Sequence, residues 1–185
     1  KIALVGYGVV LWGGEEFSLS PGTLVEIHSQ NTFDQTFTIS TIEDVLEFTV
    51  QKGFIEKFEN KKKAAAFQRK YRRYLDSYAV AIVNGLRIRK VPGIDGSTVY
   101  KLRKGDEVKV VDEVRVTDHS EPYRGTWYRV VTKDGYEGYS YGGYLTLKTG
   151  QEKIAHDSTP DLYPKLNNRF FSSTWRPDYM KRMVE

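Results

Sequence analysis

The chain has 185 residues, of which 39% are hydrophobic and 28% are charged. This composition suits one to two compact domains and excludes a protein built mainly from membrane-spanning helices. The absence of cysteine excludes disulfides, thiolate metal ligands and cysteine nucleophiles. The net charge of +4 is local, because residues 57–73 hold eight Lys or Arg and one Glu, and the rest of the chain is slightly acidic.

The first 59 residues contain four short stretches with the alternating or β-branched pattern of strands, separated by turn residues such as Pro21 and Gly22. They cover residues 8–12, 23–27, 33–39 and 46–58. We therefore predict a small all-β unit over residues 1–59. The chain begins at Lys1 rather than Met, so we expect that an N-terminal piece has been removed or is missing.

Residues 60–78 change to a helical pattern. Asn60 is a residue type that favours helix N-caps, and the apolar and aromatic residues after it recur at three- and four-residue spacings, which places them on one stripe. The stripe consists of Ala64, Phe67, Tyr71, Tyr74, Leu75 and Tyr78. The Lys/Arg cluster falls on the opposite face. We predict one amphipathic helix that links two β-rich units.

Strand patterns return over residues 79–148, with turns at Lys104-Gly105 and at the hairpin signal Lys133-Asp134-Gly135. The tail, residues 149–185, lacks clear periodicity and ends in an aromatic stretch around Trp175. An aromatic end of this kind rarely finishes a domain in solvent. We expect this tail to lead into, or dock on, a further C-terminal domain.

The two β-rich segments share short similarities. The segment at residues 22–27 is similar to that at 105–110, and residues 53–55 are similar to residues 143–145. Residues 8–11 are likewise similar to residues 85–88. These matches predict two barrels of one type; the alternative is chance similarity among β-rich segments.

Residues 79–148 resemble the bacterial SH3-like (SH3b) family. The match rests on five stretches: residues 83–89, 99–108, 125–130, 134–139 and 144–145. Together the stretches form a fairly specific set, although each one is weak alone. The resemblance implies a small β-barrel, so the fold class predicted for the whole chain is mainly β: two small SH3-like β-barrels joined by one α-helix, with a C-terminal tail.

The whole chain is also similar to spirochaete SH3 domain-containing envelope lipoproteins. The features that carry this likeness are Lys61-Lys62-Lys63-Ala64 in the helix and Thr174-Trp175-Arg176-Pro177 in the tail. It implies a location in the cell envelope, periplasmic or lipid-anchored, and a further domain beyond residue 185. The lipid-bearing cysteine of that group does not occur in this chain, which leaves anchoring open.

The resemblance also implies a ligand groove lined by aromatic residues, which binds proline-rich peptides in eukaryotic members and is associated with cell-wall peptides in bacterial ones. Trp127 starts a strand, with Tyr128 and Val130 on the opposite, core-facing side. Tyr141 and Tyr144 lie three residues apart, and such positions eclipse in a 3₁₀ turn. The candidate ligand-binding residues are therefore Trp127, Tyr141 and Tyr144, with Tyr123 in the adjacent loop.

The alternative is that these aromatic residues only pack the barrel. In the first barrel Phe54 matches Tyr144, but Gln51 falls where Tyr141 lies. That groove has fewer aromatic residues, and we therefore expect the first barrel to be structural.

The sequence offers little evidence for a catalytic or metal-binding site. Asp118-His119-Ser120 is consecutive, so its side chains cannot converge in an extended segment. The chain contains no H-E-x-x-H, phosphate-binding loop or metal-ligand spacing. We expect no catalytic residue, no metal and no cofactor, and hence not an enzyme.

The basic helix has two interpretations. It could contact a membrane surface, wall polymers or nucleic acid through its charge, or it could be a solvated face. Nucleic acid is not an expected partner, because no base-stacking aromatic residues are interleaved with the cluster.

The sequence thus predicts a non-catalytic binding module of the bacterial cell envelope, recognising a peptide, peptidoglycan or a partner protein through the aromatic groove. The alternative is a structural scaffold for a missing C-terminal domain or a partner protein. The expected segments are residues 1–59, 60–78, 79–148 and 149–185. Ligand identity and oligomeric state stay open at this point.

Overall fold

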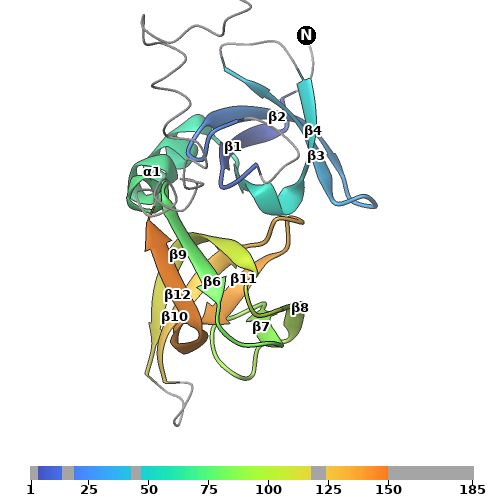
Figure 1. The fold of residues 1–185 in the computed structure, drawn as a ribbon. Coiled ribbons are helices and arrows are strands. Elements are labelled where there is room, and N and C mark those ends of the chain that lie inside the picture. Colours follow the sequence, from blue (N-terminus) through green and yellow to red (C-terminus); the bar gives the residue numbers. More distant parts are fainter. Residues whose placement is uncertain (1–3, 14–18, 43–46, 118–123, 150–185) are drawn as a thin grey trace, which may run out of the picture. The chain divides into compact units, whose positions relative to one another are not determined.

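The computed structural model describes residues 4–13, 19–42, 47–117 and 124–149, which form two antiparallel sheets and a linking helix (Figure 1). The first sheet has five strands in the order β4-β3-β2-β1-β5. The second has seven in the order β12-β6-β9-β10-β11-β7-β8. The prediction of a mainly β chain with two small barrels and one α-helix is confirmed. The predicted tail, residues 149–185, lies outside the described residues except for Thr149.

The first barrel is built from short strands whose apolar residues alternate between core and surface. On β2, for example, Val25 and Ile27 are fully buried, whereas Glu26 between them is partly exposed. Phe33 was expected in a strand but is 94% exposed in the β2–β3 turn, where its N–H donates to the side chain of Asn31. The elements are β1 (Gly6–Val10), β2 (Leu24–Asn31), β3 (Thr36–Thr41), β4 (Glu47–Gln51), the 3₁₀ turn η1 (Lys52–Phe54) and β5 (Ile55–Phe58).

The helix begins where the sequence predicts and ends earlier. The Asn60 side chain accepts the Lys63 N–H at 2.9 Å, which caps α1 (Lys61–Tyr71). A 3₁₀ turn, η2 (Arg72–Tyr74), follows. The expected helical stripe through Tyr78 is wrong, because Tyr78 lies on strand β6 (Ser77–Ala81). A spacing of four residues, such as that from Tyr74 to Tyr78, fits one stripe of a helix and also one face of a strand. In β6 the period is two, and the alternate residues Ala79 and Ala81 are buried.

The helix is fastened to the first barrel by side chains that reach backbone carbonyls. The Tyr71 hydroxyl donates to the carbonyl of Leu11 at 2.7 Å, and the Gln68 amide donates to that of Gly22 at 2.7 Å. Burial raises the pKa of the Tyr71 hydroxyl, so this group stays protonated and remains a donor. The ring of Phe67 stacks on that of Tyr71 with centroids 5.7 Å apart. These contacts make α1 part of the first barrel's packing.

The second barrel repeats the strand order of the first. Its strands β12-β6-β9-β10-β11 correspond in order to β5-β1-β2-β3-β4, and the hairpin β7-β8 extends the sheet beyond β11. The remaining elements are β7 (Leu86–Arg89), β8 (Thr98–Leu102), β9 (Glu107–Val116), β10 (Gly125–Val131), β11 (Glu137–Tyr141), the 3₁₀ turn η3 (Gly142–Tyr144) and β12 (Leu145–Thr149).

This correspondence shows which of the short sequence similarities fall at equivalent positions of the two barrels. Residues 22–27 and 105–110 fall at the equivalent strands β2 and β9, and residues 53–55 and 143–145 fall at the turns η1 and η3. The third match is wrong, because residues 8–11 begin on β1, whose equivalent is β6, whereas residues 85–88 belong to β7.

A buried lysine connects the second barrel to the end of the helix. Lys109 on β9 is fully buried, and its ammonium donates to the carbonyl of Tyr74 and, at 3.0 Å, to that of Ser77. The same ammonium lies 5.6 and 4.6 Å from the ring centroids of Tyr71 and Tyr78. Lys109 thus satisfies carbonyls where η2 turns into β6.

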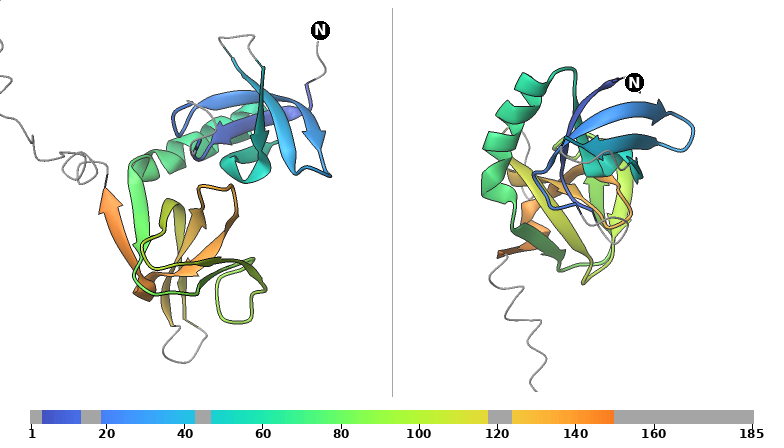
Figure 2. Two further views of the ribbon diagram at one scale, coloured as in Figure 1. Left: turned by 45° about the vertical axis from the view of Figure 1, so that its right-hand side comes forward. Right: turned by 90° about the horizontal axis from the view of Figure 1, so that it is seen from above.

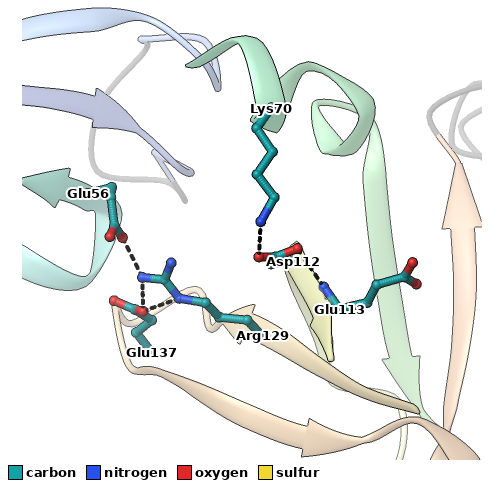
Figure 3. Close-up of polar contacts among 6 residues, drawn as sticks. All are labelled: Glu56, Lys70, Asp112, Glu113, Arg129 and Glu137. Atoms are coloured by element: carbon teal, nitrogen blue, oxygen red, sulfur yellow. Dashed lines mark hydrogen bonds and ion pairs between the residues drawn. The ribbon is translucent and has the colours of Figure 1, made fainter. Parts of the chain in front are cut away.

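Charged side chains join the two barrels directly (Figure 3). Arg129 on β10 donates through Nε to Glu137 of β11 at 2.6 Å, and its Nη2 pairs with both Glu137 and Glu56 of β5. Lys70 of α1 pairs with Asp112 of β9 at 2.7 Å.

Two glycines bring the barrels into backbone contact next to this cluster. A Cβ added to Gly53 in η1 would lie 1.7 Å from the carbonyl oxygen of Gly135. Gly135 ends the predicted β10–β11 hairpin turn, where its φ of 81° favours glycine and its N–H donates to Thr132 at 3.0 Å. Figure 2 shows this turn of the second barrel facing the first barrel. The contact therefore leaves no room for a side chain at residue 53.

We expect Gly53→Ala to push the barrels apart, because the new methyl group would meet backbone rather than a movable side chain. The expected loss is about 1–3 kcal/mol of unfolding free energy, the usual cost of overpacking. Urea denaturation measures it, and small-angle scattering reports any separation of the barrels.

The matched control is Gly143→Ala at the equivalent turn of the second barrel, where the three atoms nearest to the added Cβ belong to the Tyr141 side chain rather than to backbone. Equal stability of the two variants would contradict a tight contact at residue 53.

Candidate functional site

A cleft of about 300 Å³ opens in the second barrel, on the side where β10 begins and β11 ends. Its walls come from the segment before and within β7, the start of β10, the end of β11 and the turn η3. The lining residues are Val83, Asn84, Gly85, Leu86, Arg87, Arg89, Trp127, Tyr141 and Tyr144. The cleft is thus the place where distant segments of one small barrel converge.

Three of the four candidate residues meet in this cleft. Trp127 and Tyr141 are directly opposite each other on β10 and β11, with ring centroids 5.6 Å apart. The 3₁₀ turn η3 then brings Tyr144 to Tyr141 in an edge-to-face arrangement at 5.6 Å. Tyr123, the fourth candidate, lies outside the described residues. The aromatic patch therefore consists of Trp127, Tyr141 and Tyr144.

The three rings differ in exposure. The Trp127 side chain is 1% exposed, so the indole forms the floor of the cleft, while Tyr141 and Tyr144 are partly exposed. The expectation that Trp127 lies opposite the core-facing side of β10 is wrong. Trp127 and Val130 are both buried while Tyr128 is half-buried, because the register of β10 shifts between Arg129 and Val130. A ligand would therefore contact mainly the two tyrosines, with Trp127 supporting them from below.

Two basic residues of the cleft were missed by the sequence reasoning. On β7 the side chains alternate, so Leu86 and Ile88 are buried while Arg87 is exposed and Arg89 partly exposed. Both arginines line the cleft. The alternation of Leu-Arg-Ile-Arg is visible in the sequence and could have placed both guanidinium groups on one face.

The first barrel has no equivalent aromatic patch. The pairing Thr36↔Gln51 on β3 and β4 corresponds to Trp127↔Tyr141 on β10 and β11. The position of Tyr144 corresponds to Phe54, which is fully buried. Gly135 of the other barrel packs here, because a Cβ on it would lie 3.0 Å from Cβ of Gln51 and 3.5 Å from the Phe54 ring. In the first barrel, the positions equivalent to the cleft residues thus contact the second barrel.

The basic face of the helix is exposed as the sequence predicts. Lys61 and Arg69 are exposed, and Lys63 forms an i,i+4 ion pair with Glu59 at 3.0 Å. Lys70 pairs with Asp112 of the second barrel. At least two cations of the face therefore have carboxylate partners within the chain.

The described residues contain no group of three or more His, Asp or Glu side chains that could hold a metal ion. The side chains of His28 and Ser40 form a hydrogen bond, with Nε2 and Oγ 2.7 Å apart. His119 and His156 lie outside the described residues. Within the described part of the chain, no helix is long and apolar enough to cross a membrane.

Comparison with known protein families assigns both barrels. Residues 5–73 match the model of the TP0260 family, N-terminal SH3 domain, and residues 84–146 match that of the bacterial SH3 domain. The first match runs from β1 into η2, and the second covers β7 to η3 with every lining residue of the cleft except Val83. The SH3-like prediction for both segments is confirmed.

A relative from Treponema pallidum (strain Nichols), described as an uncharacterized protein, is 27% identical over 186 residues. The match covers 98% of this chain and 41% of that relative's length. Among solved structures, NlpC2 and NlpC1 from Trichomonas vaginalis match with a TM-score of 0.30 each, at 10% and 12% identity. The matches cover 77% of this chain, 48% of the NlpC2 chain and 46% of the NlpC1 chain.

We expect Trp127→Ala to destabilise the second barrel, because removing a fully buried indole leaves a cavity under the two tyrosines. The expected loss is about 3–5 kcal/mol of unfolding free energy. Urea denaturation followed by circular dichroism measures it. Tyr136→Ala is the control, since the Tyr136 side chain is 45% exposed outside the cleft; a Trp127→Ala chain as stable as this control would mean that the indole is not a packing residue.

Proposed function

Because the chain carries two bacterial SH3 domains, we propose that it is a non-catalytic binding module of the cell envelope. In this proposal the second domain recognises a peptide or a cell-wall component through its aromatic cleft. The observation that carries it is the convergence of Trp127, Tyr141 and Tyr144 in one cleft of that domain. Clefts of this size with aromatic walls and a few polar groups are typical ligand sites.

The shape and chemistry of the cleft favour an extended chain over a compact ligand. Half-exposed tyrosine rings offer flat apolar surface at low entropic cost, and their hydroxyls can bond to a peptide backbone. The Asn84 side chain, which accepts the Lys104 N–H at 2.9 Å, is held in place at the cleft wall. Peptide, peptidoglycan and a partner protein all present such a chain, and each is a candidate ligand.

The proposal includes a location in the cell envelope, as a periplasmic or lipid-anchored protein. Two observations support it: bacterial SH3 domains are typically extracytoplasmic, and the spirochaete relative is similar over nearly the whole chain.

The second candidate function is a scaffold that supports a further domain or a partner protein. The observation that favours it is the contact between the barrels, where Arg129 pairs with Glu56 and Gly53 touches Gly135. Two domains held together by such contacts could act as a spacer between other parts of the protein.

A pull-down with purified bacterial cell wall tests the binding function directly. We expect the unmodified chain to be retained and Tyr144→Ala to lose most of its retention, because Tyr144 supplies exposed cleft surface. Tyr136→Ala should be retained like the unmodified chain, because Tyr136 stacks on Tyr100 away from the cleft. Thermal unfolding shows whether both variants are folded.

Two salt concentrations separate the cleft from the basic helix. Retention through the helix alone would fall steeply with salt and with substitution of Arg69, Arg72 and Arg73. Retention through the cleft would depend on Tyr144 at both concentrations. If neither the chain nor its variants are retained, the wall-binding function is overturned and the scaffold becomes the favoured function.

A further inference from the structure

Two arginines line the cleft together with the aromatic patch, and their charge indicates which chemical group of a ligand the cleft would bind. We infer that the cleft binds an extended peptide through a carboxylate, which Arg87 and Arg89 hold while the peptide lies against Tyr141 and Tyr144. This inference rests on the proposed function of the cleft and adds the group that the cleft selects.

The arginines are placed by the strand itself. Arg87 and Arg89 are two residues apart on β7 and both line the cleft, while Leu86 and Ile88 between and before them are buried. Arg89 is held in position, because its Nη1 donates to the carbonyl of Gly96 at 2.6 Å. A guanidinium has five N–H donors, so this bond leaves further donors for a ligand.

Among the described residues that line the cleft, the positive charge has no acidic counterpart. The nine residues that line it include two arginines and no Asp or Glu. Lys101 on β8 is directly opposite Arg87, and both are exposed. Like charges directly opposite on neighbouring strands repel each other. A bound carboxylate would relieve this repulsion.

Another arginine of the same barrel has its positive charge neutralised by carboxylates. Arg129 is paired with the carboxylates of Glu56 and Glu137. Planar guanidinium groups bind carboxylates through two parallel hydrogen bonds, which gives direction as well as strength. At the cleft both arginines line the surface where a ligand would lie, and charge complementarity therefore favours a carboxylate as the occupant.

The carboxylate could come from a free peptide C-terminus or from an acidic side chain. Val83, Leu86 and Tyr144 supply apolar surface next to the arginines, which suits the small apolar residues at the end of a peptide. Three probes distinguish the sources: diacetyl-Lys-D-Ala-D-Ala with a free carboxylate, the same peptide as its C-terminal amide, and acetyl-Ala-Glu-Ala-amide.

Each probe is titrated into the ¹⁵N-labelled full chain and followed by amide chemical shifts around the cleft. We expect at least one of the two carboxylate peptides to bind about tenfold more tightly than the neutral amide. The Arg87→Ala chain should lose this preference. Arg115→Ala removes the same charge from an exposed residue of β9 that does not line the cleft, and it should keep the preference.

The outcomes separate this inference from the function on which it rests. Preference for the free acid alone assigns a C-terminal carboxylate, and equal binding of the Glu peptide assigns any accessible carboxylate; both support the inference. If neither carboxylate peptide binds more tightly than the neutral amide, or if the preference survives Arg87→Ala, the inference is overturned. If Tyr144→Ala still abolishes that unselective binding, the cleft keeps its function without a carboxylate site.

Absence of shifts at the cleft with all three peptides also overturns the inference. The cell-wall pull-down, which does not depend on these probes, then decides the function of the cleft.

Discussion

The guanidinium of Arg129 lies where the two barrels meet, and the arrangement of the chain depends on it. It bonds to Glu137 of its own barrel and to Glu56 of the other, with Gly53 and Gly135 in backbone contact beside it. Burial raises the pKa of the Glu137 carboxyl, while the nearby Arg129 lowers it, and the net shift is upward. A buried charge is costly unless it is paired, so this cluster specifies one geometry between the barrels rather than adding much stability.

Around that contact, one fold presents two different surfaces in the same chain. The equivalent positions carry Thr36, Gln51 and buried Phe54 in the first barrel, and Trp127, Tyr141 and Tyr144 in the second. The first set contacts Gly135 of the β10–β11 turn, and the second lines an aromatic cleft. Strand order is common to both, so the difference between the two surfaces comes from a few side chains rather than from the fold.

Local patterns were sufficient to predict much of this architecture. Strand alternation, the Asn60 cap and the three-residue spacing of Tyr141 and Tyr144 each depend on neighbours in the chain, and the structure has them as expected. Tyr78 was misplaced because its spacing fits a helix and a strand equally well. The pairing of Arg129 with Glu56 could not be predicted, because it joins residues 73 positions apart and leaves no local period.

The missing cleft of the first barrel has a consequence for how the protein would hold a polymer. Tandem domains usually gain strength through avidity, since the second binding event occurs at high effective concentration. In the described part of this chain only the second barrel has an aromatic cleft, so the pair is monovalent towards a ligand of that cleft. Under the proposed function, the two described barrels would hold one polymer strand at a time through this cleft, and firmer attachment would require several copies side by side.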